Sequence, residues 1–387
     1  MFTMGSNFVV GTYGAALKRA WPLDPAVTYL NHGGYGVAPH CVLTAQAEWR
    51  ARIEHNPTRF MRRELAPAQR EAASRLAAFL GASGDDLVFV DNATAGINAV
   101  LRSLGFGGGE EILITNLAYG AVAKAARYVA ERSGARVVEV AIPLPLSDDG
   151  AVLEAVAAAL SPRVRLAVFD HIASMSALKL PVAELTALAK KVGARVLVDG
   201  AHAPGQIALE VPAIGADWYV GNCHKWLMAP RGAGFLWASP QAQALIHPLA
   251  ISHGFGAGFH AEFDWTGTRD FTSFLCVPYG IDWHAALGGP ALMARNAALA
   301  AQAAQLLVER WGTRTLAPAS LFAAMVPVRL PLTDAPTIES AIALERRLSH
   351  EHRIEAAIMA QADGLWVRLA AQAYNEIGDY ERLAAVF

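Results

Sequence analysis

Seven short apolar runs alternate with helical patterns between about residues 70 and 240. Nearly every position in these runs is apolar, which is typical of strands buried on both faces. Between them, segments such as 121–134 and 181–193 have apolar residues at spacings of three and four and end on glycine, as helices often do. The pattern predicts an α/β fold with a mostly parallel seven-stranded sheet and helices on both faces. The runs are residues 87–90, 111–115, 136–142, 165–171, 194–200, 217–222 and 234–239.

The pattern changes after about residue 285. Long helical segments are followed by an apolar run at 326–332, a helix near 337–350 and a further apolar run within 364–375. This predicts a smaller α+β domain at the C-terminus. The predicted units are an N-terminal segment (1–28) packed on the small domain, a large domain (29–280) and the small domain itself (281–387).

Composition narrows the classes of protein. Hydrophobic residues make up 54% of the chain and charged residues 17%, a balance that often accompanies an oligomer interface. The net charge is -2 and no Lys/Arg run reaches five residues, so nucleic acid is not expected as a partner. The N-terminus has no basic region followed by an apolar core, and polar residues interrupt the stretch 291–309. We therefore expect no export signal, no membrane span and a cytoplasmic location.

Polar residues follow five of the predicted strands. Ligands in an open α/β sheet bind beyond the carboxyl ends of the strands. A single group of this kind can be explained as a helix N-cap with no role in binding. Five such groups in succession predict a ligand site. They are residues 92–94, 116–119, 170–174, 199–202 and 222–225.

The chemistry of these residues suits pyridoxal phosphate. That cofactor needs a lysine for attachment, a carboxylate for its ring nitrogen, a flat group against its ring and donors for its phosphate. Lys225 follows His224 at the end of an apolar run, and Asp199 ends the run before it. Thr94, at the start of a predicted helix, adds a hydroxyl to the helix N-terminal amides, a combination that binds phosphate. Taken alone, a lysine in the position of Lys225 is usually a surface residue that ends a strand, and Asp199 could equally be a helix N-cap.

The order and spacing of seven motifs resemble the class V aminotransferase family of fold-type I pyridoxal-phosphate enzymes. Within that family the chain is most similar to the isopenicillin N epimerase-like branch. The motifs are "YLNHGGYGVAP" (29–39), "DNATAGIN" (91–98), "DHIASMSALKLPVAEL" (170–185), "VDGAHAPGQ" (198–206), "GNCHKWLMAPRGAGFL" (221–236), "WTGTRD" (265–270) and "VRLAAQAYN" (367–375).

The resemblance implies pyridoxal 5'-phosphate as the cofactor, no metal, and three catalytic residues. Lys225 would hold the cofactor and shuttle the Cα proton, and Asp199 would pair with the ring nitrogen. His202 would lie near the phenolic oxygen, with Ser174 beside it. The residues implied at the cofactor phosphate are Ala93, Thr94, Asn222 and His224.

The resemblance also implies how substrate and partner bind. Arg368 would take the α-carboxylate of an amino-acid substrate, and Asn31 and His32 are further candidates for binding substrate. His32 and His253 could line the substrate entrance, or each could equally be a structural histidine of its loop. Thr268 would reach the phosphate of the neighbouring subunit, which implies a homodimer with shared active sites. Many family members place a histidine over the cofactor ring, and Tyr119 is the nearest flat group here. Asn222 also replaces the more common Ser or Thr.

Several reactions share this cofactor chemistry. We expect an epimerase or a C–S lyase acting at Cα or Cβ of an amino acid, with a class V aminotransferase as the alternative. A cysteine desulfurase is disfavoured, because no cysteine follows Cys276 and the side chain of Cys223 should point away from the site. A non-catalytic dimeric binding protein is disfavoured by the presence of Lys225, Asp199 and His202.

Overall fold

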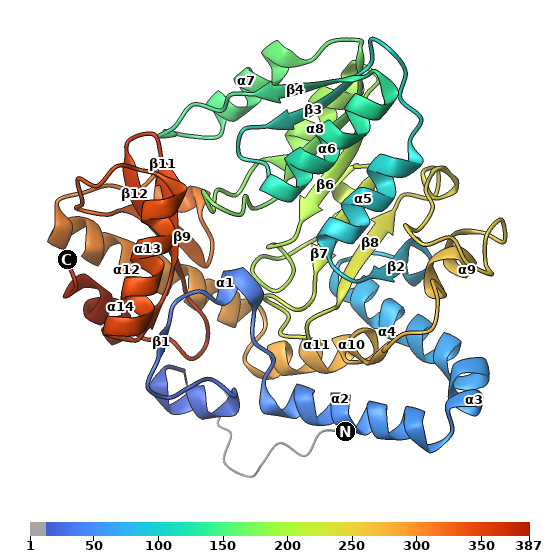
Figure 1. The fold of residues 1–387 in the computed structure, drawn as a ribbon, viewed down its shortest axis with the longest axis horizontal. Helices are drawn as coiled ribbons and strands as arrows, with labels where there is room; N and C mark the ends of the chain where they lie inside the picture. The colour runs from blue at the N-terminus through green and yellow to red at the C-terminus, as the bar shows by residue number, and fades with distance from the viewer. Residues whose placement is uncertain (1–12) are drawn as a thin grey trace.

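The computed structural model describes residues 13–387, and its centre is a seven-stranded sheet (Figure 1). The strand order is β2-β8-β7-β6-β5-β3-β4. Within this sheet β8 runs antiparallel to its neighbours and the other pairings are parallel, so the predicted mostly parallel sheet is confirmed. The strands are β2 (Leu87–Val90), β3 (Glu111–Thr115), β4 (Arg136–Val140), β5 (Val164–Asp170), β6 (Arg195–Gly200), β7 (Trp218–Asn222) and β8 (Gly234–Ala238).

Alternate residues of a central strand face two different cores. Val196 and Val198 of β6 pack in one apolar cluster, and Leu197 between them packs in the other. Side chains on both faces of such a strand are buried, which is why the predicted runs are almost continuously apolar. Helices α5 and α6 cover the face of Leu197, and α4, α7 and α8 cover the opposite face (Figure 1). These helices are α4 (Leu65–Phe79), α5 (Ala93–Ser103), α6 (Gly120–Ser133), α7 (Gly150–Ala159) and α8 (Val182–Lys191).

The C-terminal part forms a second, smaller unit of mixed structure (orange and red in Figure 1). An antiparallel sheet of order β11-β12-β9 packs against α12 and α13. The predicted boundary at residue 280 lies inside α11, a helix that packs against α4 of the large part, so a division at that residue stays a prediction. The elements are β9 (Met325–Arg329), β10 (Ile354–Glu355), β11 (Ala357–Gln361), β12 (Gly364–Ala370), α11 (Val277–Ala286), α12 (Pro290–Trp311), α13 (Ile338–His352) and α14 (Ile377–Ala384).

The described part of the N-terminal segment contacts the C-terminal part. Tyr13 Oη donates a hydrogen bond of 2.7 Å to the carbonyl oxygen of Leu287, and Trp21 packs against Tyr374. Residues 1–12 of the predicted segment lie outside the described residues. The segment leads into β1, then into α1, which lies between the two parts in Figure 1, and then into α2 and α3, which run below the sheet. These elements are β1 (Thr28–Tyr29), α1 (His32–Tyr35), α2 (His40–His55) and α3 (Pro57–Arg59); the remaining helices are α9 (Phe259–Asp264) and α10 (Thr272–Leu275).

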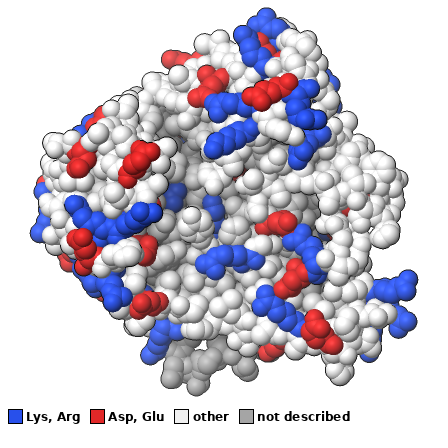
Figure 2. Space-filling model, in the orientation of Figure 1, with Lys and Arg blue, Asp and Glu red and all other residues white. Residues whose placement is uncertain are grey.

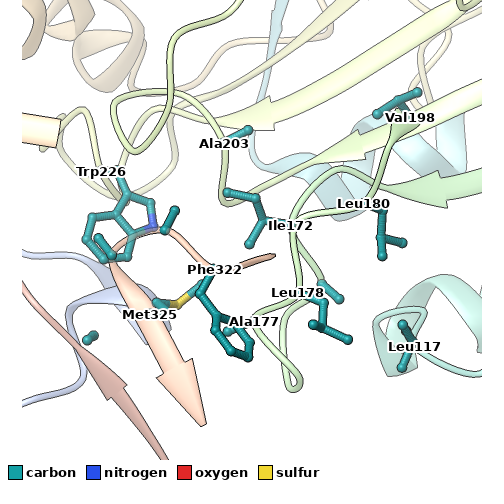
Figure 3. Packing of buried hydrophobic residues seen from close by; sticks show 14 of the residues in the cluster. Leu117, Ile172, Ala177, Leu178, Leu180, Val198, Ala203, Trp226, Phe322 and Met325 are labelled. Atoms are coloured by element: carbon teal, nitrogen blue, oxygen red, sulfur yellow. The ribbon is translucent and has the colours of Figure 1, made fainter. Parts of the chain in front are cut away.

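A buried apolar joint connects the two parts close to the lysine turn. Trp226 lies beside Met325 and Phe322, and the loop after β5 contributes Ile172 and Leu178 (Figure 3). All five side chains are at most 6% exposed. This packing holds the turn after β7 and the loop after β5 against the start of β9.

Candidate active site

A pocket of about 480 Å³ opens at the carboxyl ends of the parallel strands. Figure 2 shows this face hollowed at its centre, with Lys or Arg side chains inside the hollow. Each of the five predicted strand-end groups contributes to the lining, through residues that include Thr94, Tyr119, Ser174, Asp199 and Lys225. The strand ends therefore converge on one cavity, because parallel strands present the same end at the same edge of a sheet.

Lys225 stands in the turn that follows β7 and reaches into this pocket. Its Nζ lies 3.0 Å from Nε2 of His202. Burial, together with the nearby cation of Arg368, lowers the pKa of Lys225 to about 7, although the carboxylate of Asp199 acts in the opposite direction. A substantial share of this amine is thus neutral at pH 7, which a nucleophilic amine requires.

His202 is a buried, neutral partner for the lysine. Burial holds its pKa well below the ordinary value, and the neighbouring cations of Lys225 and Arg368 act in the same direction. Its Nε2 also lies 3.4 Å from Oγ of Ser174. Within residues 13–387, its buried Nδ1 has no hydrogen-bond partner.

The main chain of Lys225 is held from behind by His32. The imidazole of His32 is fully buried, with Nε2 3.1 Å from the carbonyl oxygen of Lys225 and Nδ1 2.9 Å from Oη of Tyr374. His32 does not line the pocket, so its position supports the lysine turn rather than the expected direct contact with substrate. Asn31, by contrast, lines the pocket.

Arg368 is a buried cation of β12 that faces the pocket. Its Nη1 donates to the carbonyl oxygen of Ser174, and its Nη2 donates to Oδ1 of Asn31 at 3.1 Å. Burial lowers its pKa to about 10. Both partners are neutral, Nε is unpartnered, and the described residues contain no carboxylate in an ion pair with it. A buried guanidinium in this state favours an anionic ligand.

Asp199 is the penultimate residue of β6 and lines the pocket. Its Oδ1 accepts a hydrogen bond of 2.9 Å from the amide of Ala201. Burial raises its pKa, while the hydrogen bond from Ala201 and the charge of Lys225 pull it down. A carboxylate placed here can accept a hydrogen bond from a ring nitrogen and favour the protonated ring.

The expected phosphate end lies at the N-terminus of α5. Asn92 caps this helix by accepting from the amide of Ala95 at 3.0 Å. Oδ1 of Asn222 accepts from the amide of Ala93 at 2.9 Å, so these two predicted phosphate contacts are engaged with each other. Thr94 lines the same end of the pocket, as does His224, whose pKa burial lowers to about 4.

The two remaining predicted residues, Tyr119 and Thr268, line different cavities. Tyr119 precedes the first residue of α6, is 44% exposed and lines the pocket. Thr268 lies outside it and lines a neighbouring cavity of about 410 Å³ beside Asp91. Sequence reasoning did not assign a role to Asp170, Tyr35 or Glu345, which also line the lysine pocket. Of these, Asp170 had a visible signal, since it ends a strand in line with Asp199.

The comparisons with known proteins bear on this site. Residues 28–348 match the Aminotransferase class-V family. The chain belongs to that family. Membership confirms the predicted fold class and identifies the chain as a pyridoxal-phosphate-dependent class V enzyme.

Relatives of this class V enzyme have different activities. It is 34% identical to a "Putative L-cysteine desulfhydrase 1" of Oryza sativa subsp. japonica, over 93% of this chain and 82% of the relative. It is 35% identical to the isopenicillin N epimerase of Streptomyces clavuligerus, over 94% of each chain. Among solved structures, a cystine C–S lyase in complex with cysteine persulfide has a TM-score of 0.78 at 22% identity and covers 93% of this chain and 97% of its own. A cysteine desulfurase from Thermococcus onnurineus NA1 has a TM-score of 0.81 at 20% identity, covering 98% of each chain. These two solved structures show that this chain has the same fold as both proteins.

The residues of the pocket fit the family cofactor. A desolvated lysine, a buried carboxylate and a helix N-terminus stand at three strand ends, as attachment, ring nitrogen and phosphate require. The unpaired guanidinium of Arg368 leaves room for a further anion. Within residues 13–387 there is no cluster of three or more His, Cys, Asp or Glu side chains able to hold a metal ion.

Proposed function

We propose that this class V enzyme is a C–S lyase that acts on a cysteine-type amino acid. The observation that carries the proposal is the arrangement of Lys225, His202 and Arg368. The amine and imidazole lie 3.0 Å apart, and among residues 13–387 no carboxylate lies within ion-pair distance of the guanidinium, although the charge of Glu345 in the same pocket acts on it. This combination provides one acid–base pair and one carboxylate anchor, which is what removal of a Cα proton and loss of a β-substituent require.

Lys225 would hold the cofactor, Asp199 would serve its ring nitrogen and Tyr119 would lie against its ring. Thr94 and His224 would line its phosphate end, and Ser174 would lie beside His202 near its phenolic oxygen. When bound, pyridoxal phosphate supplies an electrophilic carbon for the substrate amine and a ring that takes up electrons released at Cα.

The protein's own residues would then control one proton and one rotation. The amine of Lys225, with its pKa of about 7, is suited both to take the Cα proton and to return it. His202 stays neutral, and its Nε2 faces the lysine and orients its amine. Arg368 would grip the α-carboxylate with a planar fork, which fixes rotation about Cα and selects the bond to be broken.

The positions of the cysteines favour a lyase over a desulfurase, which needs a nucleophilic thiol at the substrate. Cys223 and Cys276 are fully buried in apolar clusters, and Cys41 is half-buried. None of the three lines the lysine pocket. Burial raises the pKa of each thiol, which disfavours the reactive thiolate.

Epimerisation is the second candidate, because the identity to isopenicillin N epimerase extends over 94% of both chains. It would need a second proton donor on the opposite face of Cα.

The expected homodimer is supported by Thr268, which lies outside the lysine pocket of its own chain, and by exposed apolar side chains at Leu249, Ile251 and Phe255. No helix of residues 13–387 has the length and apolarity to cross a membrane. The cytoplasmic location stays a prediction.

The test is a substrate screen with the purified enzyme. Reduction with borohydride should first leave the cofactor on the peptide that contains Lys225. L-cysteine, L-cystine and S-substituted cysteines would then be assayed for pyruvate, ammonia and the released sulfur compound; from cysteine the balance is cysteine plus water to pyruvate, ammonia and hydrogen sulfide. Lys225→Ala is the inactive control.

Other products would point to other reactions. Solvent deuterium entering Cα with inversion and no pyruvate would replace the lyase with an epimerase. Turnover that depends on a 2-oxo acid would indicate an aminotransferase, and alanine formed from cysteine would indicate a desulfurase. Label on a peptide other than that of Lys225 would overturn the cofactor assignment.

A further inference from the structure

The C-terminal part contributes a carboxylate to the wall of the lysine pocket. The acidic residues that line the pocket are Asp91, Asp170, Asp199 and Glu345. Asp91 is paired with Arg269, and Asp170 and Asp199 stand near the ends of β5 and β6. Glu345 belongs to α13 instead, and the mechanism proposed above assigns it no role.

The carboxylate of Glu345 is fixed beside Arg368 but is not paired with it. Its Oε1 accepts a hydrogen bond of 2.9 Å from the amide of Ile358. Ile358 lies in β11, where its neighbour Ala357 is the direct cross-strand partner of Arg368, and both β11 residues line the pocket. Within residues 13–387 no Lys, Arg or His lies within ion-pair distance of Glu345, and its Oε2 accepts no hydrogen bond. A half-buried carboxylate is thus held near the guanidinium with one oxygen available to a ligand.

Substrate binding would change the charge balance around Glu345. Burial lowers the pKa of Arg368, and the charge of Glu345 opposes this shift, so the cation and the carboxylate act on each other across the pocket. An α-carboxylate bound to Arg368 would neutralise the guanidinium and leave the negative charge of Glu345 without compensation. A half-buried carboxylate in that state is stabilised by a new cation.

Apolar side chains lie close to the same guanidinium. Tyr35 ends the short helix that begins after Asn31, and Met175 follows Ser174; Asn31 and Ser174 are the hydrogen-bond partners of Arg368. Tyr35 is 70% exposed and Met175 44%, and both line the pocket. They offer apolar surface to a carbon chain, and a tyrosine ring also attracts a cation.

We propose that Glu345 is a specificity-determining residue that binds a positively charged β-substituent of the substrate. The inference rests on the proposed function and names the substrate class: a cysteine whose sulfur carries a short carbon chain that ends in an ammonium group. Arg368 takes the α-carboxylate and Glu345 takes the ammonium. In the elimination the Cα proton is lost and the Cβ–S bond breaks with its electron pair on sulfur. Substrate plus water gives pyruvate, ammonia and an aminoalkyl thiol.

The experiment compares three S-substituted cysteines of similar size. S-aminoethyl-L-cysteine ends in an ammonium group, S-propyl-L-cysteine in a methyl group and S-carboxyethyl-L-cysteine in a carboxylate. All three present the same α-carboxylate to Arg368, so differences between them come from the distal group. The first readout is the dissociation constant of each probe, measured by stopped flow from the change in the visible absorption band of the bound cofactor. The second is kcat/KM for pyruvate formation.

The unmodified enzyme should bind the ammonium probe on the order of tenfold more tightly than the propyl probe, and the carboxylate probe most weakly. This preference should shrink as ionic strength rises. Glu345→Gln removes the charge but keeps an acceptor for the Ile358 amide, so the preference should disappear while affinity for the propyl probe is unchanged. The matched control is Glu351→Gln, which alters an exposed carboxylate of the same helix outside the pocket and should keep the preference.

Equal affinity for the ammonium and propyl probes in the unmodified enzyme would overturn the assignment, as would an unchanged preference in Glu345→Gln. Thermal unfolding shows whether that variant folds. If it does not, the unmodified enzyme still decides, because a preference for the neutral or the anionic probe overturns the inference. No change of the absorption band with the ammonium probe would also overturn it. Pyruvate from none of the probes, with the expected order of affinities intact, would contradict the proposed lyase and support the recognition of charge by Glu345.

Discussion

Nζ of Lys225 lies 3.0 Å from Nε2 of His202, and burial opposes a charge on both groups. A neutral amine can donate to a neutral imidazole nitrogen, so this contact requires no buried ion. The pair resolves why a lysine ends an apolar strand here. Its environment favours the unprotonated form, and that form is the nucleophile.

This arrangement predicts an unusually reactive lysine in the cofactor-free protein. Labelling of Lys225 with a small excess of an acylating reagent should rise with pH through a midpoint near 7, the value to which burial lowers its pKa, and level off above it. An ordinary lysine titrates near 10.5. The sign follows from the chemistry, because only the neutral amine, present above the pKa, is acylated. Mass spectrometry of the Lys225 peptide measures the rate.

Two variants test the cause of that midpoint. Arg368→Met removes a cation that lowers the pKa of Lys225, so the midpoint should rise. Asp199→Asn removes a carboxylate that raises it, so the midpoint should fall. A midpoint near 10.5 in the unmodified protein would show that the amine is solvated, contrary to the structure.

Replacing Arg368 should weaken the interaction with substrate but leave cofactor binding unchanged. Arg368→Lys loses the planar fork, so kcat/KM should fall by about 1.5–3 kcal/mol, or about 10- to 150-fold. Turnover should fall along with affinity, because the carboxylate grip also sets rotation about Cα. Steady-state kinetics on the best substrate measures both.

The matched control is Arg329→Lys on the neighbouring strand β9. Arg329 donates to the carbonyl oxygen of Asp363 and does not line the pocket, so its kinetics should match those of the unmodified enzyme. If Arg368→Lys and Arg368→Ala also matched, the substrate carboxylate would bind elsewhere.

The proposed homodimer with shared active sites predicts complementation between inactive protomers. Lys225→Ala and Thr268→Ala subunits, mixed and reassembled, should regain activity, because one site of each heterodimer would have both residues intact. At most half of the unmodified specific activity is expected. Mixing Lys225→Ala with Asp199→Asn is the control, since both residues line the same pocket of one protomer and no intact site can form. Equal failure of both mixtures in verified heterodimers would contradict sharing.

Gly36 should be intolerant of a side chain because the lysine turn passes beside it. Its φ is +61°, and a Cβ there would lie 1.9 Å from the carbonyl oxygen of His224. Gly36→Ala should therefore destabilise the protein by about 1–3 kcal/mol and weaken cofactor binding by displacing the turn. Differential scanning calorimetry and cofactor titration measure these effects. Gly120→Ala, where nothing lies within 4 Å of the added Cβ, should change neither.

Much of the large part of the fold could be predicted from the sequence. Residues 87–90 and 111–115 agree with β2 and β3 at both ends, because a strand buried on both faces must be apolar at nearly every position. The order of Asp199 and Lys225 after successive strands indicated the site for a similar reason. The direction of parallel strands brings such residues to one edge, whatever the details of packing.

The surroundings of individual side chains could not be predicted in this way. Arg368 alternates with apolar residues in its strand, a pattern typical of a solvent-facing side chain, yet all seven residues of β12 are buried. Segments distant in the chain, at Asn31 and Ser174, cover it. His32 likewise supports the lysine from behind, and Thr268 lies in a separate cavity.

The difference has one physical reason. Hydrophobic periodicity records the neighbours that a strand or helix always has, namely the adjacent strands and the layer packed on them. Which loops then close over a strand end depends on contacts between segments hundreds of residues apart, such as those between Asn31 and Arg368 or His32 and Tyr374. The sequence by itself therefore determined the sheet, the family and the residues at its strand ends. Only the tertiary structure decided which of those residues face the pocket and which support it from behind.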